Sequence, residues 1–386
     1  MLGWELPPHN SGGLGVACFG LAKALSSGGV RITFVLPKKV DLKVDFMDLV
    51  FADVKEAEDL HSSYSTLWMS KTFLKAGDFP ADYVRAALFY GLKIREIAAK
   101  LRADVIHAHD WLTYPAAIAA KEILKVPLVV HIHNTVFDRG CGNANRHEYE
   151  IEKRGFEEAD KIVSVSNFTK NTLVERYGIA PDKIQTVYNG IETTGRKQLE
   201  PALKPMKDLG YKIVLYLGRI TLQKGPDYFV KAAGKVLEYY PKALFVIAGS
   251  GDLQEQVMSE AAHLGIVGNI IFTGFLRGDD RDRIYQAADL FVMPSVSEPF
   301  GIVPLEAINN GTPVMVSKQS GVSEVLSHAL KVDFWDVDEM ANKILAVLNY
   351  PSLSNDLVDG GNRELPFINW NESASKCIEI YKQLIF

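Results

Sequence analysis

The sequence is poor in cysteine and has no long apolar run. Its 386 residues include three cysteines, Cys18, Cys141 and Cys377, and no CxxC pair. Thiols so few and so far apart exclude a disulfide framework or a zinc ribbon and are typical of a reducing compartment. No apolar stretch approaches the roughly 20 residues of a membrane-spanning helix. The N-terminus also shows no basic segment followed by an apolar one, so we expect no signal peptide and a soluble, cytoplasmic protein.

An excess of positive charge is missing as well. Lys and Arg total 42, Asp and Glu total 47, and the formal net charge is −5. A chain-wide basic surface for nucleic acid or anionic lipid is therefore not expected. The hydrophobic fraction of 47% and the charged fraction of 23% are ordinary globular values, which excludes disorder and fibrous repeats.

Short apolar runs alternate with amphipathic segments along most of the chain. Such runs between helices predict parallel strands that are covered on both faces. Helices are predicted at 16–26, 83–101, 114–124 and 372–384, and the segment 38–78 is less regular. The predicted strands are 1–4, 31–36, 104–107, 127–131 and 161–165 in the first half, and 212–217, 244–248, 270–272, 290–293 and 313–316 in the second.

A polar segment with Gly195, Pro201 and Pro205 separates the two series of strands. Gly and Pro in such a segment are typical of a linker. We therefore expect an α/β protein with two doubly wound, Rossmann-like parallel-sheet domains. Ligands of such sheets bind beyond the carboxyl ends of the strands, so the sequence predicts a site in a cleft between the domains.

Two glycine-rich loops each follow a predicted strand. Gly12 and Gly13 begin the stretch Gly-Gly-Leu-Gly, and Gly249 begins Gly-Ser-Gly. Glycines at a helix start let backbone N–H groups approach an anion, but they also suit a tight turn without a ligand. Neither loop has the GxGxxG spacing and the chain has no Walker motif, so the usual dinucleotide and P-loop signatures are missing.

Two cations follow the first strand of the second half. Arg219 and Lys224 lie in the loop that ends at Gly225, just before Pro226, a residue type typical of a first helical position. A guanidinium fork and an ammonium at a strand end suit a diphosphate. Ordinary surface cations are the alternative.

Two carboxylates, Glu298 and Glu306, bracket a Pro- and Gly-rich loop after the run 290–293. Pro304 predicts a helix start, which places Glu306 in the first turn. The N–H groups of Gly301, Ile302 and Val303 would then be donors without helical partners. The carboxylates of such a loop can accept hydrogen bonds from sugar hydroxyls, and its N–H groups can donate hydrogen bonds to a phosphate. A Glu in the first turn also interacts favourably with the helix dipole, which is the alternative explanation for Glu306.

Four histidines occur in two pairs, His107 with His109 and His131 with His133. We expect the two side chains of each pair to lie on opposite faces of the sheet, so that one histidine of each pair faces the ligand. A metal site needs three or four convergent ligands and is therefore not favoured. Asp280-Arg281-Asp282 and Asp336-Val337-Asp338 have the spacing of a metal–diphosphate motif, but helix capping is the preferred interpretation.

Together these motifs resemble the retaining glycosyltransferases of family 4, which have the GT-B fold. The resemblance rests on Gly-Gly-Leu-Gly, Gly-Arg-x4-Lys-Gly and Glu-x7-Glu in this order, and it covers nearly the whole chain. The segments His-Ala-His-Asp-Trp and Val-Ser-Asn-Phe-Thr look like the glycogen and starch synthase branch. The implied domains are 1–195 on the acceptor side, 196–365 for the nucleotide sugar, and a final helix, 366–386, that returns to the first domain.

The resemblance also implies a role for each matching residue. Arg219 and Lys224 would hold the donor diphosphate, and Glu306 would bind the ribose hydroxyls. The transferred sugar would meet Glu298, His133 and the backbone of Phe300, Gly301, Ile302 and Val303. Gly12 and Gly13 would approach the phosphates, Gly249 and Leu276 would lie near the nucleotide, and His109 and Asp110 would lie toward the acceptor. Asn10 stands where the synthases usually have a lysine, which weakens the acceptor and donor assignments.

The activity implied is transfer of a hexose, with glucose expected, from a nucleoside diphosphate sugar to a sugar or α-glucan hydroxyl, with retention and without a metal or other cofactor. Neither nucleic acid nor a membrane is expected as a partner. The alternatives are another acceptor (a small sugar, a sugar phosphate or a lipid), an epimerase or phosphorylase on the same fold, and a non-catalytic nucleotide-sugar sensor. A lipid-directed enzyme would use the basic residues of one predicted helix to bind a membrane, although a solvated helix face is the preferred interpretation. These residues are Lys93, Arg95, Lys100 and Arg102.

Overall fold

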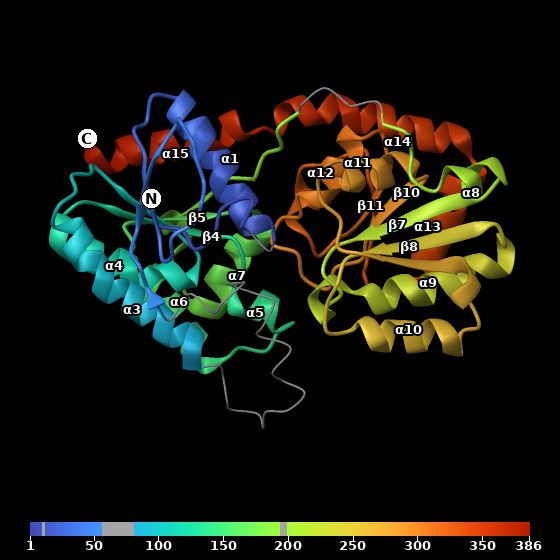
Figure 1. Cartoon of the computed structure of the whole chain (residues 1–386), viewed down its shortest axis with the longest axis horizontal. Coiled ribbons are helices and arrows are strands. Elements are labelled where there is room, and N and C mark those ends of the chain that lie inside the picture. The colour runs from blue at the N-terminus through green and yellow to red at the C-terminus, as the bar shows by residue number, and fades with distance from the viewer. Residues whose placement is uncertain (10–11, 56–80, 194–198) are drawn as a thin grey trace. The chain divides into compact units, whose positions relative to one another are not determined.

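The computed structural model describes residues 1–9, 12–55, 81–193 and 199–386. These residues form two compact units (Figure 1). The first comprises Met1–Glu192 and Asn369–Phe386, and the second comprises Thr193–Ile368. The predicted boundary at 195 falls in a segment outside the described residues, and the observed return to the first unit at Asn369 lies close to the predicted position 366.

The sheet of the first unit is parallel. Its four central strands follow in the order β3-β4-β5-β6, and β1 and β2 form a parallel pair beside them. Leu2 bridges β1 at Val35 and β3 at Ala108, so the predicted strand 1–4 is reduced to two isolated bridges. The strands are β1 Thr33–Leu36, β2 Asp48–Phe51, β3 Ile106–His109, β4 Leu128–Ile132, β5 Lys161–Ser164 and β6 Ile184–Thr186.

Helices cover both faces of this sheet. One core contains residues of α3, α4 and α6, including Tyr90 and Phe156. The other contains Cys18 of α1 and Cys377 of α15, so the last helix completes the first unit. The helices are α1 Gly13–Ser27, α3 Ala81–Ala98, α4 Tyr114–Leu124, α5 Val136–Arg139, α6 Arg146–Glu158, α7 Asn167–Tyr177 and α15 Trp370–Ile385.

The second unit has one six-stranded parallel sheet in the order β12-β11-β10-β7-β8-β9. The chain runs outward from β7 through β8 to β9, and then returns to the other side of β7 with β10. This reversal makes the β7–β10 edge a topological switch point, where ligands of such sheets bind. The strands are β7 Lys212–Leu217, β8 Ala243–Ala248, β9 Ile270–Gly274, β10 Leu290–Met293, β11 Val314–Ser317 and β12 Leu330–Val332.

The helices of the second unit are amphipathic and pack on both sides of its sheet. Phe229 and Val236 of α9 and Met340 and Ile344 of α13 are fully buried in one core with the strands. Among the described residues, no helix is long and apolar enough to cross a bilayer. The helices are α8 Lys204–Asp208, α9 Pro226–Tyr239, α10 Gln254–His263, α11 Gly278–Ala287, α12 Val303–Asn309, α13 Val337–Asn349 and α14 Pro351–Glu364.

Candidate functional site

The predicted diphosphate loop and the predicted sugar loop meet at the switch point of the second unit. Strands β7 and β10 are neighbours, with Val214 paired to Leu290. Because both strands are parallel, the loop that carries Arg219 and Lys224 and the loop that carries Glu298 leave the sheet at the same edge.

Gly225 lets these two loops come close. It has φ +64°, and a β-carbon at this position would lie 2.2 Å from the carbonyl oxygen of Pro294. The Val296 N–H also donates to the carbonyl of Gln223 at 2.9 Å. Both the left-handed conformation and the lack of space therefore require glycine here.

Lys224 and Glu298 form an ion pair at this edge. The Lys224 Nζ lies 2.5 Å from Glu298 Oε2, and their side chains are only 19% and 10% exposed. Backbone hydrogen bonds from Glu298 to Gln319 and from Gly321 to Glu298 hold the carboxylate's own segment. Since an ammonium has three N–H donors, Lys224 can bind Glu298 and still donate to a bound anion.

Glu306 is held by two side chains of α11. Arg281 Nη1 donates to its Oε1 at 2.8 Å, and the Tyr285 hydroxyl donates to its Oε2 at 3.1 Å. Burial raises the pKa of Glu306, while the positive charge of Arg281 opposes that rise. The carboxylate keeps lone pairs for further donors, which is the chemistry needed to bind neighbouring hydroxyl groups.

The helix start predicted at Pro304 is confirmed, because α12 begins at Val303 and has Glu306 in its first turn. The N–H groups of Gly301, Ile302 and Val303 have no acceptor among the described residues. Phe300 is buried, and its carbonyl accepts from the Val322 N–H at 2.7 Å. The predicted row of backbone donors is therefore present beside Glu298 and Glu306.

The two Asp-x-Asp stretches have different uses. Asp336 caps α13 by accepting from the Glu339 N–H, as predicted. Asp280 and Asp282 lie inside α11 and cap nothing, because the helix begins at Gly278. Asp282 instead binds Arg281, which in turn holds Glu306. Arg281 and Tyr285 were missed as site residues, since only the tertiary fold brings them to Glu306.

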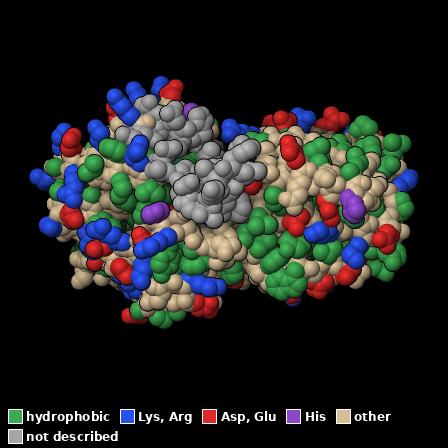
Figure 2. Space-filling view, turned by 90° about the horizontal axis from the view of Figure 1, so that it is seen from below, with side chains coloured by type: hydrophobic (Ala, Val, Ile, Leu, Met, Phe, Trp, Pro, Cys, Tyr) green, Lys and Arg blue, Asp and Glu red, His purple; other side chains and the backbone are tan. Residues whose placement is uncertain are grey.

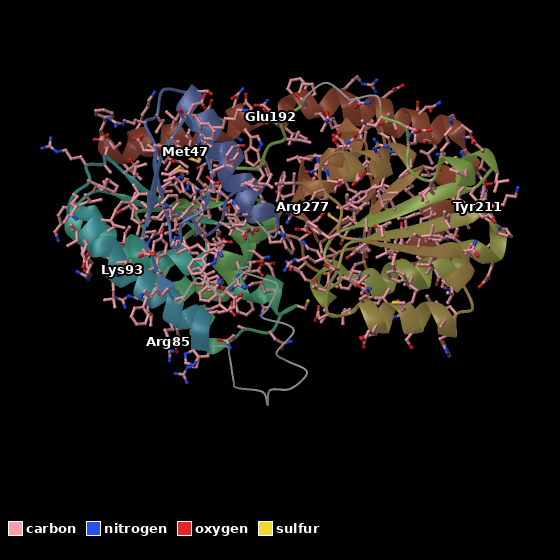
Figure 3. The ribbon with its side chains drawn as sticks, viewed as in Figure 1. Met47, Arg85, Lys93, Glu192, Tyr211 and Arg277 are labelled. Carbon is pink, nitrogen blue, oxygen red and sulfur yellow. The ribbon has the colours of Figure 1, made fainter. Side chains whose placement is uncertain are left out.

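Gly249 and Leu276 follow β8 and β9 at the same edge of the sheet. A β-carbon on Gly249 would lie 1.9 Å from the carbonyl oxygen of Gly218, so close packing of two loops explains this glycine without a ligand. Leu276 is half-buried, and the exposed Arg277 next to it lies over the Phe275 ring at 4.9 Å. Figure 3 shows Arg277 at the edge toward which β7 and β8 run, which adds a cation that the sequence analysis did not single out.

The four histidines of the first unit form one cluster at the ends of β3 and β4. The predicted division of each pair between two faces is wrong, because residues i and i+2 of a strand lie on the same face. The imidazoles of His107 and His109 stack at 4.5 Å, and those of His131 and His133 stack at 4.2 Å. His109 and His131 are also direct partners in the sheet register.

Hydrogen bonds join these rings across the two strands. His109 Nδ1 lies 3.1 Å from His133 Nε2, and His107 Nε2 lies 3.3 Å from His131 Nδ1. Burial lowers the pKa of His107, His109 and His131 and lowers that of His133 to about 3, so all four rings are neutral at pH 7.

Two groups in this cluster, His107–His109–His131 and Cys18–His109–His133, have ligand atoms within 4.8 Å of one another. Three convergent donors would suit a divalent cation. The stacked rings are nearly parallel, however, with 18° between His107 and His109, so their in-plane lone pairs run side by side and do not meet at one point. The first of these groups therefore fits a metal poorly.

His109 and Asp110 both form hydrogen bonds with His133. The resemblance implied that both lie toward the acceptor, but the two residues are 0% and 1% exposed. The Asp110 Oδ1 accepts the His133 N–H at 2.6 Å. Gly12 and Gly13 begin α1, and a β-carbon on either would meet no described atom within 4 Å, so packing does not explain these glycines.

Comparisons with known proteins agree with this architecture. The model of the family "Glycosyltransferase Family 4" matches residues 11–194, and that of "Glycosyl transferases group 1" matches residues 203–364. An uncharacterised glycosyltransferase of Methanocaldococcus jannaschii is 30% identical over 99% of this chain and 97% of its own. A glycogen synthase of Mycobacterium tuberculosis is 27% identical over 99% of this chain and 93% of its own.

The same fold occurs in a sucrose-phosphate synthase from Thermosynechococcus elongatus, with a TM-score of 0.78 and 20% identity over 97% of this chain and 94% of that one. Two Rossmann-like parallel-sheet units with this topology have the GT-B fold. The chain belongs to glycosyltransferase family 4, and is a transferase enzyme.

Proposed function

We propose that the protein transfers a hexose, glucose in the first instance, from a nucleoside diphosphate sugar to a hydroxyl of a sugar or α-glucan, with retention of the anomeric configuration. The observation that carries this proposal is the Lys224–Glu298 pair at the switch point of the second unit. The similarity to a glycogen synthase supports the choice of sugar and acceptor.

The diphosphate is bound by Arg219, Lys224 and the N–H groups before α12. As the glycosidic bond breaks, the departing phosphate gains negative charge, and fixed cations and N–H donors stabilise it. We propose that these groups supply the charge stabilisation without a divalent cation. The acceptor hydroxyl passes its proton to the departing phosphate oxygen, so no dedicated base is needed.

The remaining groups bind the donor's sugars. Glu306, oriented by Arg281 and Tyr285, accepts hydrogen bonds from the ribose hydroxyls. Glu298 contacts the transferred hexose, and its ion pair with Lys224 fixes the position of its carboxylate. His133 is neutral, as its lowered pKa requires, and acts as a hydrogen-bond partner of the hexose.

Calorimetric titration tests this proposal with UDP-, ADP- and GDP-glucose, followed by transfer assays with glycogen, small sugars and sugar phosphates as acceptors. We expect one nucleotide sugar to bind and its hexose to be transferred with retention. Binding without transfer to any acceptor would identify a nucleotide-sugar sensor. Release of the sugar to phosphate, or its epimerisation, would identify the same-fold alternatives.

A lipid acceptor is a second candidate, because the exposed face of α3 combines apolar and basic side chains. Leu88 and Leu92 are 53% and 60% exposed. Arg85 and Lys93 lie on the same helix (Figure 3), and Figure 2 shows basic and apolar side chains on the underside of the first unit. Such a face is typical of helices that lie on anionic membranes. Flotation with anionic and neutral liposomes tests this: co-flotation with anionic liposomes only supports a lipid acceptor, and no co-flotation contradicts it.

A further inference from the structure

The segment after β4 begins with His133, the predicted sugar-contacting residue. Ionisable side chains form hydrogen bonds with its main chain at four consecutive residues. The N–H of His133 donates to Asp110 Oδ1 at 2.6 Å, and the carbonyl of Asn134 accepts from Arg139 Nη1 at 2.5 Å. The N–H of Thr135 donates to Asp138 Oδ2 at 2.8 Å, and the N–H of Val136 donates to Glu152 Oε2 at 3.1 Å. One main-chain group of every residue from 133 to 136 is therefore bonded to an ionisable side chain.

These four side chains are themselves buried and come from three parts of the unit. Asp110, Asp138, Arg139 and Glu152 are 1%, 3%, 7% and 0% exposed. Asp110 follows β3, Asp138 and Arg139 belong to α5, and Glu152 belongs to α6. The segment is thus fixed from several directions at once, which a single turn motif would not do.

Arg139 is the centre of this arrangement. Its guanidinium also binds Glu148 Oε2 through Nε at 2.9 Å and Glu152 Oε1 through Nη2 at 2.7 Å. The Tyr177 hydroxyl donates to the second oxygen of Glu152. Burial raises the pKa of Glu152 to about 7, and the positive charge of Arg139 opposes that rise.

Helix capping explains only part of this network. Thr135 and Asp138 form a capping box for α5, which accounts for the Thr135 N–H. It does not account for Asp110, Arg139 or Glu152. Burying ionised groups costs desolvation energy, and replacing such groups by apolar ones is often neutral or stabilising. A strand could end here without buried ionised groups and at a lower cost in free energy. The network is therefore better explained by the residue that it orients.

The oriented group is His133. Its main chain is held by Asp110, its imidazole is held by His109 at 3.1 Å, and the next residue is held by Arg139. We propose that Asp110, Arg139 and Glu152 are positioning residues that set the main chain at 133–136, and with it the place where His133 meets the transferred sugar. This inference rests on the proposed function.

The test compares Arg139→Lys, Asp110→Asn and Glu152→Gln with wild type and with Glu150→Gln. Glu150 lies on α6 two residues from Glu152, but it faces solvent and pairs only with Arg146 among the described residues. Hydrogen exchange at the amides of His133, Thr135 and Val136 reports the main chain directly. Steady-state transfer with the nucleotide sugar found to bind reports the consequence for the reaction.

We expect Glu152→Gln and Asp110→Asn to raise the exchange rates of the Val136 and His133 amides, respectively. We expect all three variants to lower kcat by about 10- to 100-fold, the range expected when a reacting group is displaced by about 1 Å. The donor KM should change by less than about threefold, because the diphosphate and ribose contacts lie in the second unit. Glu150→Gln should match wild type in both measurements.

Unchanged amide exchange in the three variants would overturn the proposal, as would faster exchange with an unchanged kcat. If one variant fails to fold, the other two still test the proposal, because each of the three removes a different hydrogen bond. If wild type neither binds nor transfers any nucleotide sugar, the proposed function fails. In that case the exchange experiment still shows whether these side chains hold the segment.

Discussion

Acid should destabilise the first unit through its four buried histidines. In the unfolded chain a histidine has a pKa near 6.5, whereas burial lowers the pKa of all four in the folded protein. The unfolded state therefore binds more protons below pH 6.5, and the free energy of unfolding falls as the pH falls.

The magnitude follows from these pKa values. If each ring stays neutral when folded, lowering the pH from 7.5 to 5.5 costs about 1.4 kcal/mol per histidine, or about 5.5 kcal/mol for four. Glu152 acts in the opposite direction, because its pKa of about 7 exceeds the value of 4.5 expected when unfolded. It regains about 2 kcal/mol over the same range, so these five groups together cost about 3.5 kcal/mol.

The assay is urea unfolding at pH 7.5, 6.5 and 5.5, followed by the fluorescence of the buried Trp111 and its neighbours in the first unit. His131→Gln removes one titrating ring and should reduce the acid-induced loss by about 1.4 kcal/mol. His147→Gln changes an exposed histidine on α6 and should leave the loss as in wild type. If His131→Gln loses as much stability as wild type between pH 7.5 and 5.5, the histidine cluster is not the cause.

Three further predictions concern the second unit. Gly225→Ala forces a β-carbon against Pro294 and should lower the free energy of unfolding by about 1–3 kcal/mol in denaturant titration. The control Gly234→Ala, whose β-carbon would lie 3.4 Å from its nearest neighbour, should be nearly neutral. Equal effects of the two substitutions would contradict the close approach of the two loops. Tyr285→Phe removes one hydrogen bond to Glu306 and should raise the KM for the nucleotide sugar by about 5- to 15-fold, the effect of one net hydrogen bond, with little change in kcat. An unchanged KM would show that Tyr285 does not contribute to the site. Dialysis against EDTA should leave the transfer rate unchanged, and a loss restored by Mg²⁺ would refute the proposed metal-free mechanism.

Strands whose apolar runs are buried on both faces could be predicted from the sequence. β7 and β10 have the predicted bounds, because the four inner residues of β7 and all four residues of β10 are buried. β2 and β6 were not predicted, because they are short and partly exposed and so lack a continuous apolar run. The strand predicted at 1–4 is present only as the bridges of Leu2, although Leu2 occupies the place of a strand between β1 and β3.

The candidate site could be predicted only where local signals define it. Lys224 and Glu298 lie between a strand end and a helix start, and Glu306 lies in the first turn of α12, so their common edge follows from the topology. Arg281 and Tyr285 reach Glu306 from another helix, and no local pattern indicates such a contact. The histidine cluster was predicted incorrectly for a different reason: the period of the strand was misapplied, and correct use of it places each pair on one face.

The central claim is that Lys224 and its neighbours at the β7–β10 edge bind the diphosphate of a nucleotide sugar. Calorimetric titration of wild type, Arg219→Ala, Lys224→Ala and the control Lys231→Ala with the preferred nucleotide sugar tests it most directly. Lys231 lies on the adjacent helix α9 and pairs with Asp227. We predict that Arg219→Ala and Lys224→Ala weaken binding by at least about tenfold, the loss expected for one charge-assisted hydrogen bond, while Lys231→Ala binds as wild type does. Wild-type affinity in both Arg219→Ala and Lys224→Ala would contradict the account.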